Sequence, residues 1–327
     1  MNPIRLGILG PGRIVARTMA DVIPHCSNIK VTAIASRDPQ RARDAAARYG
    51  AEYAYTSYDE LAHSDKIDLV YVSTPHAFHC EQAIAMMNAG KNVLCEKPLA
   101  RNDREVRMMV EAARRNKVFF MEAMWTRFFP ASIQLKKDVA SGVIGRPRHF
   151  FGEFCYASDF DSESRIYAPE LAGGALLDVG VYPLMAATNL FGYRPVDFQV
   201  SAVLAPSGVD ARTCASLTFE GGVTAQFACA VDSVGPSIAF IYGSDGFIEV
   251  PHFWCPTEYT VTNSQGTRRV DFGAEANEGY RHEFSAVADL VARGEKECPL
   301  VTWEESIAIA GLTTAMREKI GVKYPGE

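Results

Sequence analysis

The sequence lacks any C-x-x-C pair, and its eight cysteines are scattered along the 327 residues. They stand at Cys26, Cys80, Cys95, Cys155, Cys214, Cys229, Cys255 and Cys298. Isolated cysteines of this kind are typical of reduced thiols in a cytosol, and they do not form the clusters that a structural zinc site needs. We therefore expect a cytoplasmic protein without a metal centre.

Two classes of partner are disfavoured by further absences. No segment approaches the roughly 20 uninterrupted apolar residues that a membrane helix needs. The start of the chain runs directly into a short apolar strand and has no signal-peptide core. Acidic residues number 39 and basic residues 33, which gives a net charge of -6. Because that charge attracts neither nucleic acid nor anionic lipid, we expect no membrane and no nucleic acid as a partner.

The first part of the chain, as far as Met121, alternates short apolar runs with amphipathic helical stretches. The expected strands are Ile4–Leu9, Ile29–Ser36, Leu69–Val72, Asn92–Cys95 and Val118–Met121, and the expected helices are Gln40–Tyr49 and Glu105–Arg115. This alternation is the pattern of a parallel sheet with helices on both faces. The sequence therefore predicts an α/β fold that begins with a doubly wound Rossmann sheet.

The pattern changes after Met121, where strands follow one another with short turns. The expected strands are Phe198–Leu204, Cys214–Phe219, Val223–Cys229 and Ile238–Tyr242, and the expected helices are Ala131–Ser141, Val181–Leu190, Tyr280–Arg293 and Trp303–Ile320. Consecutive strands with turns such as Glu220-Gly221-Gly222 indicate a largely antiparallel sheet. We expect a C-terminal α+β domain with an open sheet.

A chain of this length exceeds the usual size of a single hydrophobic core, so two domains are expected. The change of pattern assigns residues 1–121 to a Rossmann domain and residues 122–327 to a substrate-binding and dimerisation domain. The C-terminal helix of the second can pack back on the first. Strand residues 225–230 are apolar on both alternating faces. If helices cover one face, the other can form a homodimer.

A glycine-rich turn follows the first strand and opens a helix. Its key residues are Gly10, Gly12, Arg13 and Ile14. In this context Gly10 permits the tight turn, and Gly12 lets a pyrophosphate approach the helix N-terminus. The sequence therefore predicts a dinucleotide site.

The second strand ends in Ser36-Arg37-Asp38, where an NAD enzyme usually has an acidic residue for the ribose diol. Ser36 can donate a hydrogen bond to the 2′-phosphate of NADP, and the Arg37 guanidinium can pair with it or stack on adenine. Asp38 would repel that phosphate or bind a ribose if its carboxylate turned inward. We expect NADP as the cofactor, and NAD remains possible.

Two further strands end in polar residues that can carry chemistry. Hydride transfer at an alcohol carbon requires a proton to move at the oxygen, so a general acid/base must lie beside the nicotinamide. The candidates lie just after two of the expected strands. Thr74, Pro75, His76 and His79 follow Leu69–Val72, and Glu96 and Lys97 follow Asn92–Cys95. Ligands bind at this edge of parallel sheets.

These motifs together resemble the Gfo/Idh/MocA family of oxidoreductases over nearly the whole chain. The resemblance lies in Gly10-Pro11-Gly12, Ser73–His76 with His79, Glu96-Lys97-Pro98, and residues 173–182 with Asp178 and Tyr182. Residues 121–128, which include Trp125 and Arg127, are similar to the subgroup of dimeric dihydrodiol dehydrogenase and NADP-dependent D-xylose dehydrogenase. The family implies a hydride transfer between nicotinamide and a sugar, polyol or cyclic diol.

The resemblance also implies roles for single residues. Lys97 would lie near the nicotinamide and the substrate hydroxyl, Asp178 would orient the substrate, and Tyr182 would be the acid/base. Trp125 and Arg127 would flank the nicotinamide and the pocket. The Lys97–Pro98 bond is expected to be cis, which proline alone adopts at low cost.

The physical chemistry of a tyrosine base agrees with these roles. A free tyrosine has a pKa of about 10, so it must be lowered by roughly two units to act near neutral pH. A lysine ammonium within about 4 to 6 Å supplies a shift of that size. Asp178 and Tyr182 are four residues apart and project from one face if their segment is helical. The mechanism therefore requires Lys97 and Tyr182 to meet beside the cofactor ring.

Two alternatives stay open at this point. Some members of the family cleave glycosides by transient oxidation without net turnover of the cofactor, and a non-catalytic dinucleotide sensor is a third class. A sensor should lack the proton-transfer set that Lys97, Asp178 and Tyr182 supply. Arg165, Tyr167 and Tyr156 either line the substrate pocket or lie in a solvated loop, and the sequence does not favour one over the other.

Overall fold

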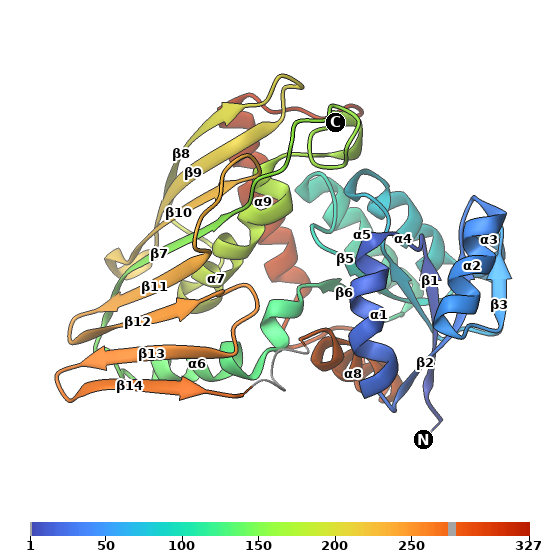
Figure 1. Cartoon of the computed structure of the whole chain (residues 1–327), viewed down its shortest axis with the longest axis horizontal. Coiled ribbons are helices and arrows are strands. Elements are labelled where there is room, and N and C mark those ends of the chain that lie inside the picture. Colours follow the sequence, from blue (N-terminus) through green and yellow to red (C-terminus); the bar gives the residue numbers. More distant parts are fainter. Residues whose placement is uncertain (1, 274–278) are drawn as a thin grey trace. The chain divides into compact units, whose positions relative to one another are not determined.

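The computed structural model describes residues 2–273 and 279–327, and the chain forms two compact units (Figure 1). Unit 1 contains Met1–Trp125 and Glu278–Ile307, and unit 2 contains Thr126–Asn277 and Ala308–Glu327. The boundary expected between residues 121 and 122 assigns residues 279–307 to the second domain. In the structure they belong to unit 1, because helix α8 (Gly279–Ala292) packs on α1 (Arg13–His25) and on the sheet.

Unit 1 is built on a six-stranded sheet in the order β3-β2-β1-β4-β5-β6, and every neighbouring pair is parallel. The strands are β1 (Ile4–Leu9), β2 (Ile29–Ala35), β3 (Tyr53–Tyr55), β4 (Leu69–Val72), β5 (Asn92–Glu96) and β6 (Phe120–Ala123). The remaining helices are α2 (Pro39–Tyr49), α3 (Tyr58–His63), η1 (His76–Phe78), α4 (His79–Asn88) and α5 (Asp103–Asn116). The Rossmann sheet predicted from the sequence is confirmed.

Local sequence explains where these helices begin and end. Ser57 caps α3 by accepting the Glu60 N–H, and the Glu60 side chain returns to the Ser57 N–H, which is a capping box. The Asn102 side chain accepts the Glu105 N–H at the start of α5. Helix α2 ends at Gly50, whose φ of +70° suits glycine. Such caps satisfy backbone groups that would otherwise lack partners.

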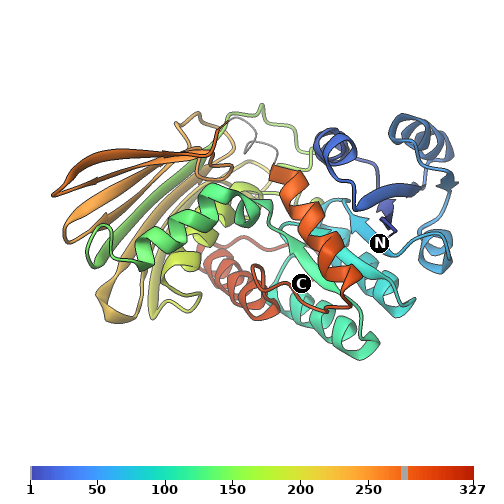
Figure 2. The same ribbon diagram turned by 90° about the horizontal axis from the view of Figure 1, so that it is seen from below.

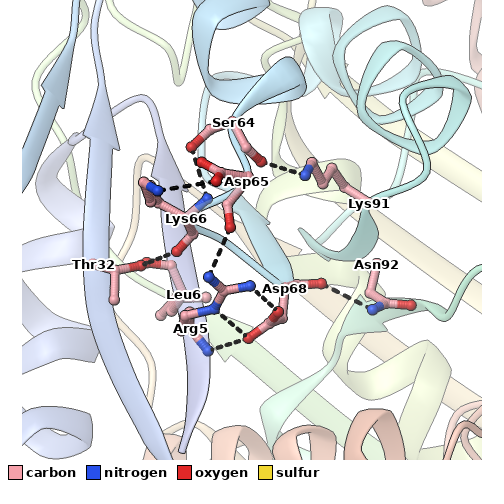
Figure 3. Close-up of polar contacts among 9 residues, drawn as sticks. All are labelled: Arg5, Leu6, Thr32, Ser64, Asp65, Lys66, Asp68, Lys91 and Asn92. Carbon is pink, nitrogen blue, oxygen red and sulfur yellow. Dashed lines mark hydrogen bonds and ion pairs between the residues drawn. The ribbon is translucent and has the colours of Figure 1, made fainter.

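A polar cluster joins the amino ends of β1 and β4 (Figure 3). This edge of the sheet is opposite to the carboxyl ends of the strands, where the predicted cofactor residues lie. Arg5 donates through Nε and Nη2 to Asp68 at 3.0 and 2.6 Å, and its backbone N–H reaches the same carboxylate at 2.9 Å. Arg5 Nη1 also donates to the Asp65 carbonyl at 2.7 Å. The cluster therefore joins the two strands through charged side chains and backbone groups together.

Unit 2 is built on an eight-stranded sheet in the order β14-β13-β12-β11-β7-β10-β9-β8. The strands are β7 (Pro147–Cys155), β8 (Asp197–Leu204), β9 (Asp210–Thr218), β10 (Thr224–Ala230), β11 (Ile238–Gly243), β12 (Gly246–Pro251), β13 (Glu258–Asn263) and β14 (Gly266–Asp271). Only the β7–β10 pair is parallel among these neighbours. The predicted open, mostly antiparallel sheet is confirmed, although β7 and β12 to β14 were not foreseen.

Helices cover one face of this sheet, as Figure 2 shows for α6 and α7. The helical segments in order are η2 (Trp125–Phe128), α6 (Pro130–Ala140), η3 (Pro169–Leu171), η4 (Leu176–Gly180), α7 (Val181–Phe191), η5 (Glu220–Gly222) and α9 (Trp303–Ile320). Ala225, Phe227 and Cys229 of β10 are buried, whereas Thr224 and Gln226, which alternate with them, are exposed. Within the described residues, no helix lies on the second face of the sheet.

One helical stretch in the described part of the chain, Pro169–Phe191, has the length and apolar composition of a membrane span. Its most apolar window is 89% buried inside the protein. The segment carries η4 and α7, which pack on β7, β9 and β10. Its hydrophobicity is therefore that of a core helix.

Candidate active site

The turn after β1 has the geometry that a dinucleotide needs. Gly10 has a φ of +83°, and a β-carbon at this position would lie 2.5 Å from Thr74 Cγ2, so only glycine fits. Gly12 is the N-cap residue of α1, and as glycine it offers no capping side chain. Arg13 and Ile14 follow as the first helical residues. The backbone N–H groups at this helix N-terminus form a favourable position for a pyrophosphate.

The end of β2 carries the residues expected to select the cofactor. Ser36 is buried and Arg37 is exposed. Asp38 Oδ1 accepts the Gln40 N–H at 2.9 Å and the Arg41 N–H at 3.2 Å, so this carboxylate caps helix α2. The Asp38 N–H donates in turn to Ser36 Oγ at 3.2 Å. The acidic group that could oppose a 2′-phosphate is therefore directed into the helix N-terminus.

The loop after β4 is tied to the loop after β5 by His79. Thr74 and Pro75 lead into His76 of η1, and His79 begins α4. His79 is fully buried, with Nδ1 3.0 Å from the Pro98 carbonyl oxygen and Nε2 2.7 Å from the Thr74 carbonyl oxygen. Burial lowers the pKa of His79. This side chain thus positions the two loops rather than presenting its ring at the surface.

Glu96 and Lys97 lie at the carboxyl end of β5. The Tyr71 hydroxyl donates to Glu96 Oε1, and the Lys97 backbone N–H donates to Glu96 Oε2 at 3.2 Å. Glu96 is buried, and its carboxylate fixes the position of the Lys97 backbone through this hydrogen bond. The Lys97–Pro98 peptide is cis, as predicted.

A second buried carboxyl group lies near Lys97. Ser306 Oγ donates to Glu122 Oε2 at 2.7 Å, and Glu122 follows Met121 in β6. Burial raises the pKa of Glu122 to about 7, while Ser306, the Leu99 backbone and the Lys97 charge act against that rise. The charge of Lys97 thus favours the ionised form of a buried carboxyl group whose pKa is raised by its own burial.

Trp125 and Arg127 fall on different units although they are neighbours in the sequence. Trp125 is the last residue of the first segment of unit 1. Its ring stacks on that of Tyr280 with centroids 4.1 Å apart, and the Arg17 guanidinium lies 5.3 Å from the Trp125 centroid. Arg127 belongs to unit 2, is buried, and lines a cavity together with Ser132. The structure does not group these two predicted residues within one unit.

Asp178 lies in the π-helical turn η4, which continues into α7 and carries Tyr182 one turn later. The helical segment assumed for their spacing is thus present. The Tyr156 hydroxyl donates to Asp178 Oδ2 at 2.5 Å, and Arg165 Nη1 donates to Oδ1 at 2.8 Å. Burial and the Asp178 charge raise the pKa of Tyr156. Tyr156 therefore stays protonated and acts as a hydrogen-bond donor in this group.

Aromatic side chains surround Tyr182. Its ring lies 5.4 Å from the ring of Phe154 and 6.5 Å from that of Trp254, measured between centroids. Phe154 and Trp254 stack on each other with centroids 5.0 Å apart. The Trp254 carbonyl accepts a hydrogen bond from Thr126 Oγ1 at 2.5 Å. Phe154 and Trp254 thus form an apolar wall beside Tyr182, which stands one helical turn after Asp178.

Buried polar contacts with Asp210 of β9 hold the segment that carries Asp178. Asp210 Oδ2 accepts the Leu176 N–H at 2.7 Å and the Thr213 hydroxyl at 2.7 Å. A β-carbon at Gly174, whose φ is +120°, would lie 2.3 Å from Asp210 Oδ1. Burial raises the pKa of Asp210 to about 6. This arrangement fixes the start of η4 and with it the position of Asp178.

The structure groups the predicted site residues by unit. In unit 1 the glycine turn, Ser36, Thr74 and Lys97 all follow carboxyl ends of neighbouring parallel strands. In unit 2 Asp178 and Tyr182 share one helical segment. Phe154 and Trp254 were not predicted, because they are 100 residues apart and carry no motif. For Tyr156 and Arg165 the sequence favoured neither a site role nor a solvated loop, and their contacts with Asp178 supply the missing signal.

A dinucleotide fits the residues of unit 1. The Gly10 turn leaves no room for a side chain, and the first turn of α1 offers N–H donors for a pyrophosphate. Ser36 and Arg37 provide a hydroxyl and a cation at the end of β2, while Asp38 is engaged as a helix cap. This donor set suits the phosphates and the adenosine half of a nicotinamide cofactor.

A Rossmann unit with this glycine turn, followed by an open-sheet unit with Asp178 and Tyr182, is the organisation of a dinucleotide-dependent oxidoreductase. Residues 4–124 match the oxidoreductase family with an NAD-binding Rossmann fold, and residues 132–249 match the Gfo/Idh/MocA C-terminal domain. The chain belongs to the Gfo/Idh/MocA family of oxidoreductases, as its motifs predicted.

Similar proteins include dehydrogenases and reductases. The trans-1,2-dihydrobenzene-1,2-diol dehydrogenase of Danio rerio is 36% identical over 98% of both chains. The crystal structure of KijD10, a 3-ketoreductase from Actinomadura kijaniata in complex with NADP and TDP-benzene, has a TM-score of 0.87, 29% identity, and coverage of 97% and 98%. The aldose-aldose oxidoreductase of Caulobacter crescentus shares the fold, with a TM-score of 0.88 at 22% identity over 97% of both chains.

Proposed function

We propose that this oxidoreductase transfers a hydride between NADP(H) and a hydroxyl-bearing carbon of a small cyclic substrate, a sugar, polyol or cyclic diol. The observation that carries the proposal is the group around Asp178. There the buried carboxylate of Asp178 meets the Tyr156 hydroxyl and the Arg165 guanidinium, and the rings of Phe154 and Trp254 lie against Tyr182, in a family whose members are oxidoreductases.

The chain's own residues have to manage the proton and the substrate hydroxyl. The nicotinamide, when bound, supplies or accepts the hydride. Tyr182 acts as the acid/base that exchanges the hydroxyl proton, and Asp178 orients the substrate through its carboxylate. Lys97 contributes an ammonium charge, which favours the phenolate of Tyr182 and polarises the substrate oxygen. In this scheme Tyr156 and Arg165 hold Asp178 in place.

The substrate class follows from the two kinds of surface in unit 2. Phe154 and Trp254 offer flat apolar faces, which suit the C–H face of a sugar ring or the ring of a cyclic diol. The polar group of Asp178 suits the hydroxyls of such a ring. The relatives named for dihydrobenzenediol oxidation and for 3-keto reduction support this class.

NADP rather than NAD is proposed as the preferred cofactor. Ser36 and Arg37 offer a hydroxyl and a guanidinium where the 2′-phosphate would lie, and Asp38 is turned into the cap of α2. The KijD10 complex, which holds NADP, supports the same choice.

The assignment of Tyr182 is tested by Tyr182→Phe. We expect the variant to lose about a hundredfold or more in kcat while its Kd for NADPH stays unchanged, because only the proton route is removed. Turnover is followed by NADPH absorbance across a panel of aldoses, polyols and trans-dihydrobenzenediol. Tyr193→Phe, which lies outside the group, serves as the control. Unchanged turnover in Tyr182→Phe with any active substrate contradicts the assignment.

A further inference from the structure

Asp178 has two partners that differ in charge. The Tyr156 hydroxyl, which follows β7, is a neutral donor at 2.5 Å, whereas the Arg165 guanidinium is a cation at 2.8 Å. Both come from outside the helical segment on which Asp178 stands. The Asp178 side chain is 7% exposed and that of Arg165 is 52% exposed. The carboxylate is therefore buried, and the charge that balances it reaches in from the surface.

The charge of Asp178 acts on Tyr182, which follows one turn later on the same segment. A buried carboxylate without a counter-charge would oppose a second negative charge nearby and so hold the phenol in its neutral form. With Arg165 paired to it, the net charge of the pair is zero. An ion pair of zero net charge opposes a phenolate at Tyr182 less than an unbalanced carboxylate does.

Arg165 also interacts with the tyrosines directly. The Asp178 carboxylate raises the pKa of Arg165, and Tyr156 and Tyr182 add smaller contributions in the same direction. By the same reciprocity, the guanidinium favours the anionic form of each group that interacts with it.

Other groups near this segment differ in what they can do. Tyr167 donates its hydroxyl to the carbonyls of Ser158 and Val231, so it is engaged with the backbone. Asp210 of β9 and Cys229 of β10 lie beneath η4, and burial raises the pKa of both. Neither of them supplies a positive charge, whereas Arg165 is a cation that pairs with Asp178.

We propose that Arg165 is a positioning residue for the proton transfer, whose charge offsets that of Asp178 and so allows the Tyr182 phenolate to form. Tyr156, by contrast, holds the geometry of Asp178 without affecting that charge balance. The inference rests on the proposed function for its role in turnover. The expected change in the pKa of Tyr182 is a property of the protein alone and is measured without substrate.

The first test is a titration of tyrosinate absorbance, in which each protein is compared with the same protein carrying Tyr182→Phe. The difference isolates Tyr182. Arg165→Gln should raise the pKa of Tyr182 by about one unit, and Arg165→Lys should restore most of the parent value. Asp178→Asn, which leaves the guanidinium unbalanced, should lower it. Tyr156→Phe should leave it within a few tenths of a unit.

Shifts of opposite sign from Arg165→Gln and Asp178→Asn would not arise from a merely structural role. If Arg165→Gln does not fold, as judged by circular dichroism, the Asp178→Asn and Arg165→Lys titrations still decide the sign. No shift in the variants that fold, or a shift in Tyr156→Phe as large as that in Arg165→Gln, overturns the inference.

The second test links the charge to catalysis. For oxidation of trans-dihydrobenzenediol or whichever panel substrate is active, the low-pH limb of kcat/KM should move upward by about one unit in Arg165→Gln. In Tyr156→Phe kcat/KM should fall without that movement. If Tyr182→Phe retains activity, the proposed function fails while the titration still stands. If Tyr182→Phe is inactive and Arg165→Gln leaves both pH curves unchanged, the inference fails alone.

Discussion

At the scale of single residues, the hydrogen bonds of the Asp38 carboxylate affect which dinucleotide the chain is expected to prefer. A carboxylate at the end of the second strand of a Rossmann sheet usually binds the ribose diol of NAD. Here it accepts two backbone N–H groups of α2. This role both stabilises the helix and removes a negative charge from the space next to Arg37.

The cofactor preference is tested by Arg37→Ala. Loss of the guanidinium should weaken NADPH binding by about tenfold or more and change NADH binding little, because only NADPH has the 2′-phosphate. The Kd values come from titration of NADPH and NADH fluorescence. Arg43→Ala, an exposed arginine of α2 that contacts Gln40, is the matched control. Equal losses for both cofactors in Arg37→Ala would refute the 2′-phosphate role.

At the scale of elements, the amino ends of β1 and β4 are joined by the pair of Arg5 and Asp68. Arg5 holds the pKa of Asp68 below its usual range, chiefly through the side-chain hydrogen bond. A carboxylate with a lowered pKa contributes stability that is present above its unfolded pKa and is lost as pH falls through the folded value. The contribution is small, because both side chains are about a third or more exposed.

Asp68→Asn should lower the free energy of unfolding by about 1 kcal/mol at neutral pH, since the charged hydrogen bonds to Arg5 become neutral ones. Urea unfolding at several pH values measures this. The difference from the parent should shrink as pH falls below about 4. Asp65→Asn is the control, because the Asp65 side chain pairs with Lys66 and is 81% exposed. A difference that persists at low pH would contradict the electrostatic explanation.

At the scale of the whole molecule, we propose that the open face of the eight-stranded sheet forms a homodimer. In the described chain no helix covers that face. Phe240 and Tyr242 alternate along β11 with the buried Ala239 and Ile241, so their aromatic side chains lie on the uncovered face. Phe240 and Tyr242 of β11 stack with centroids 5.9 Å apart, and His149 of β7 stacks on Tyr242. A sheet face with aromatic and small side chains suits an isologous contact between two copies.

Light scattering at micromolar concentration should give a mass of about twice the 35.8 kDa of the chain. Phe240→Glu should give the monomer mass, because it brings like charges together across a two-fold contact. Val234→Glu, which replaces a residue that is 83% exposed and outside the strands, should stay dimeric. A monomer mass for the parent protein removes the proposal.

Local sequence patterns determined much of this protein. The five strands expected in the first part of the chain are all present, and α9 has the bounds predicted for it, Trp303–Ile320. The glycine turn and the spacing of Asp178 and Tyr182 were also readable, whereas the cis Lys97–Pro98 peptide was implied by the family resemblance. These features depend on periodicity, turn chemistry and motif spacing over a few residues, which the sequence displays directly.

Only the tertiary structure decided which distant residues meet. Strand β7 lies between β10 and β11, and residues 279–307 join the Rossmann unit. Arg165 pairs with Asp178, and Trp254 stacks on Phe154, although no local pattern links either pair. Such contacts are selected by burial of apolar surface and by pairing of buried charge over the whole chain. Because those free energies depend on the assembled core, no short segment of the sequence encodes them alone.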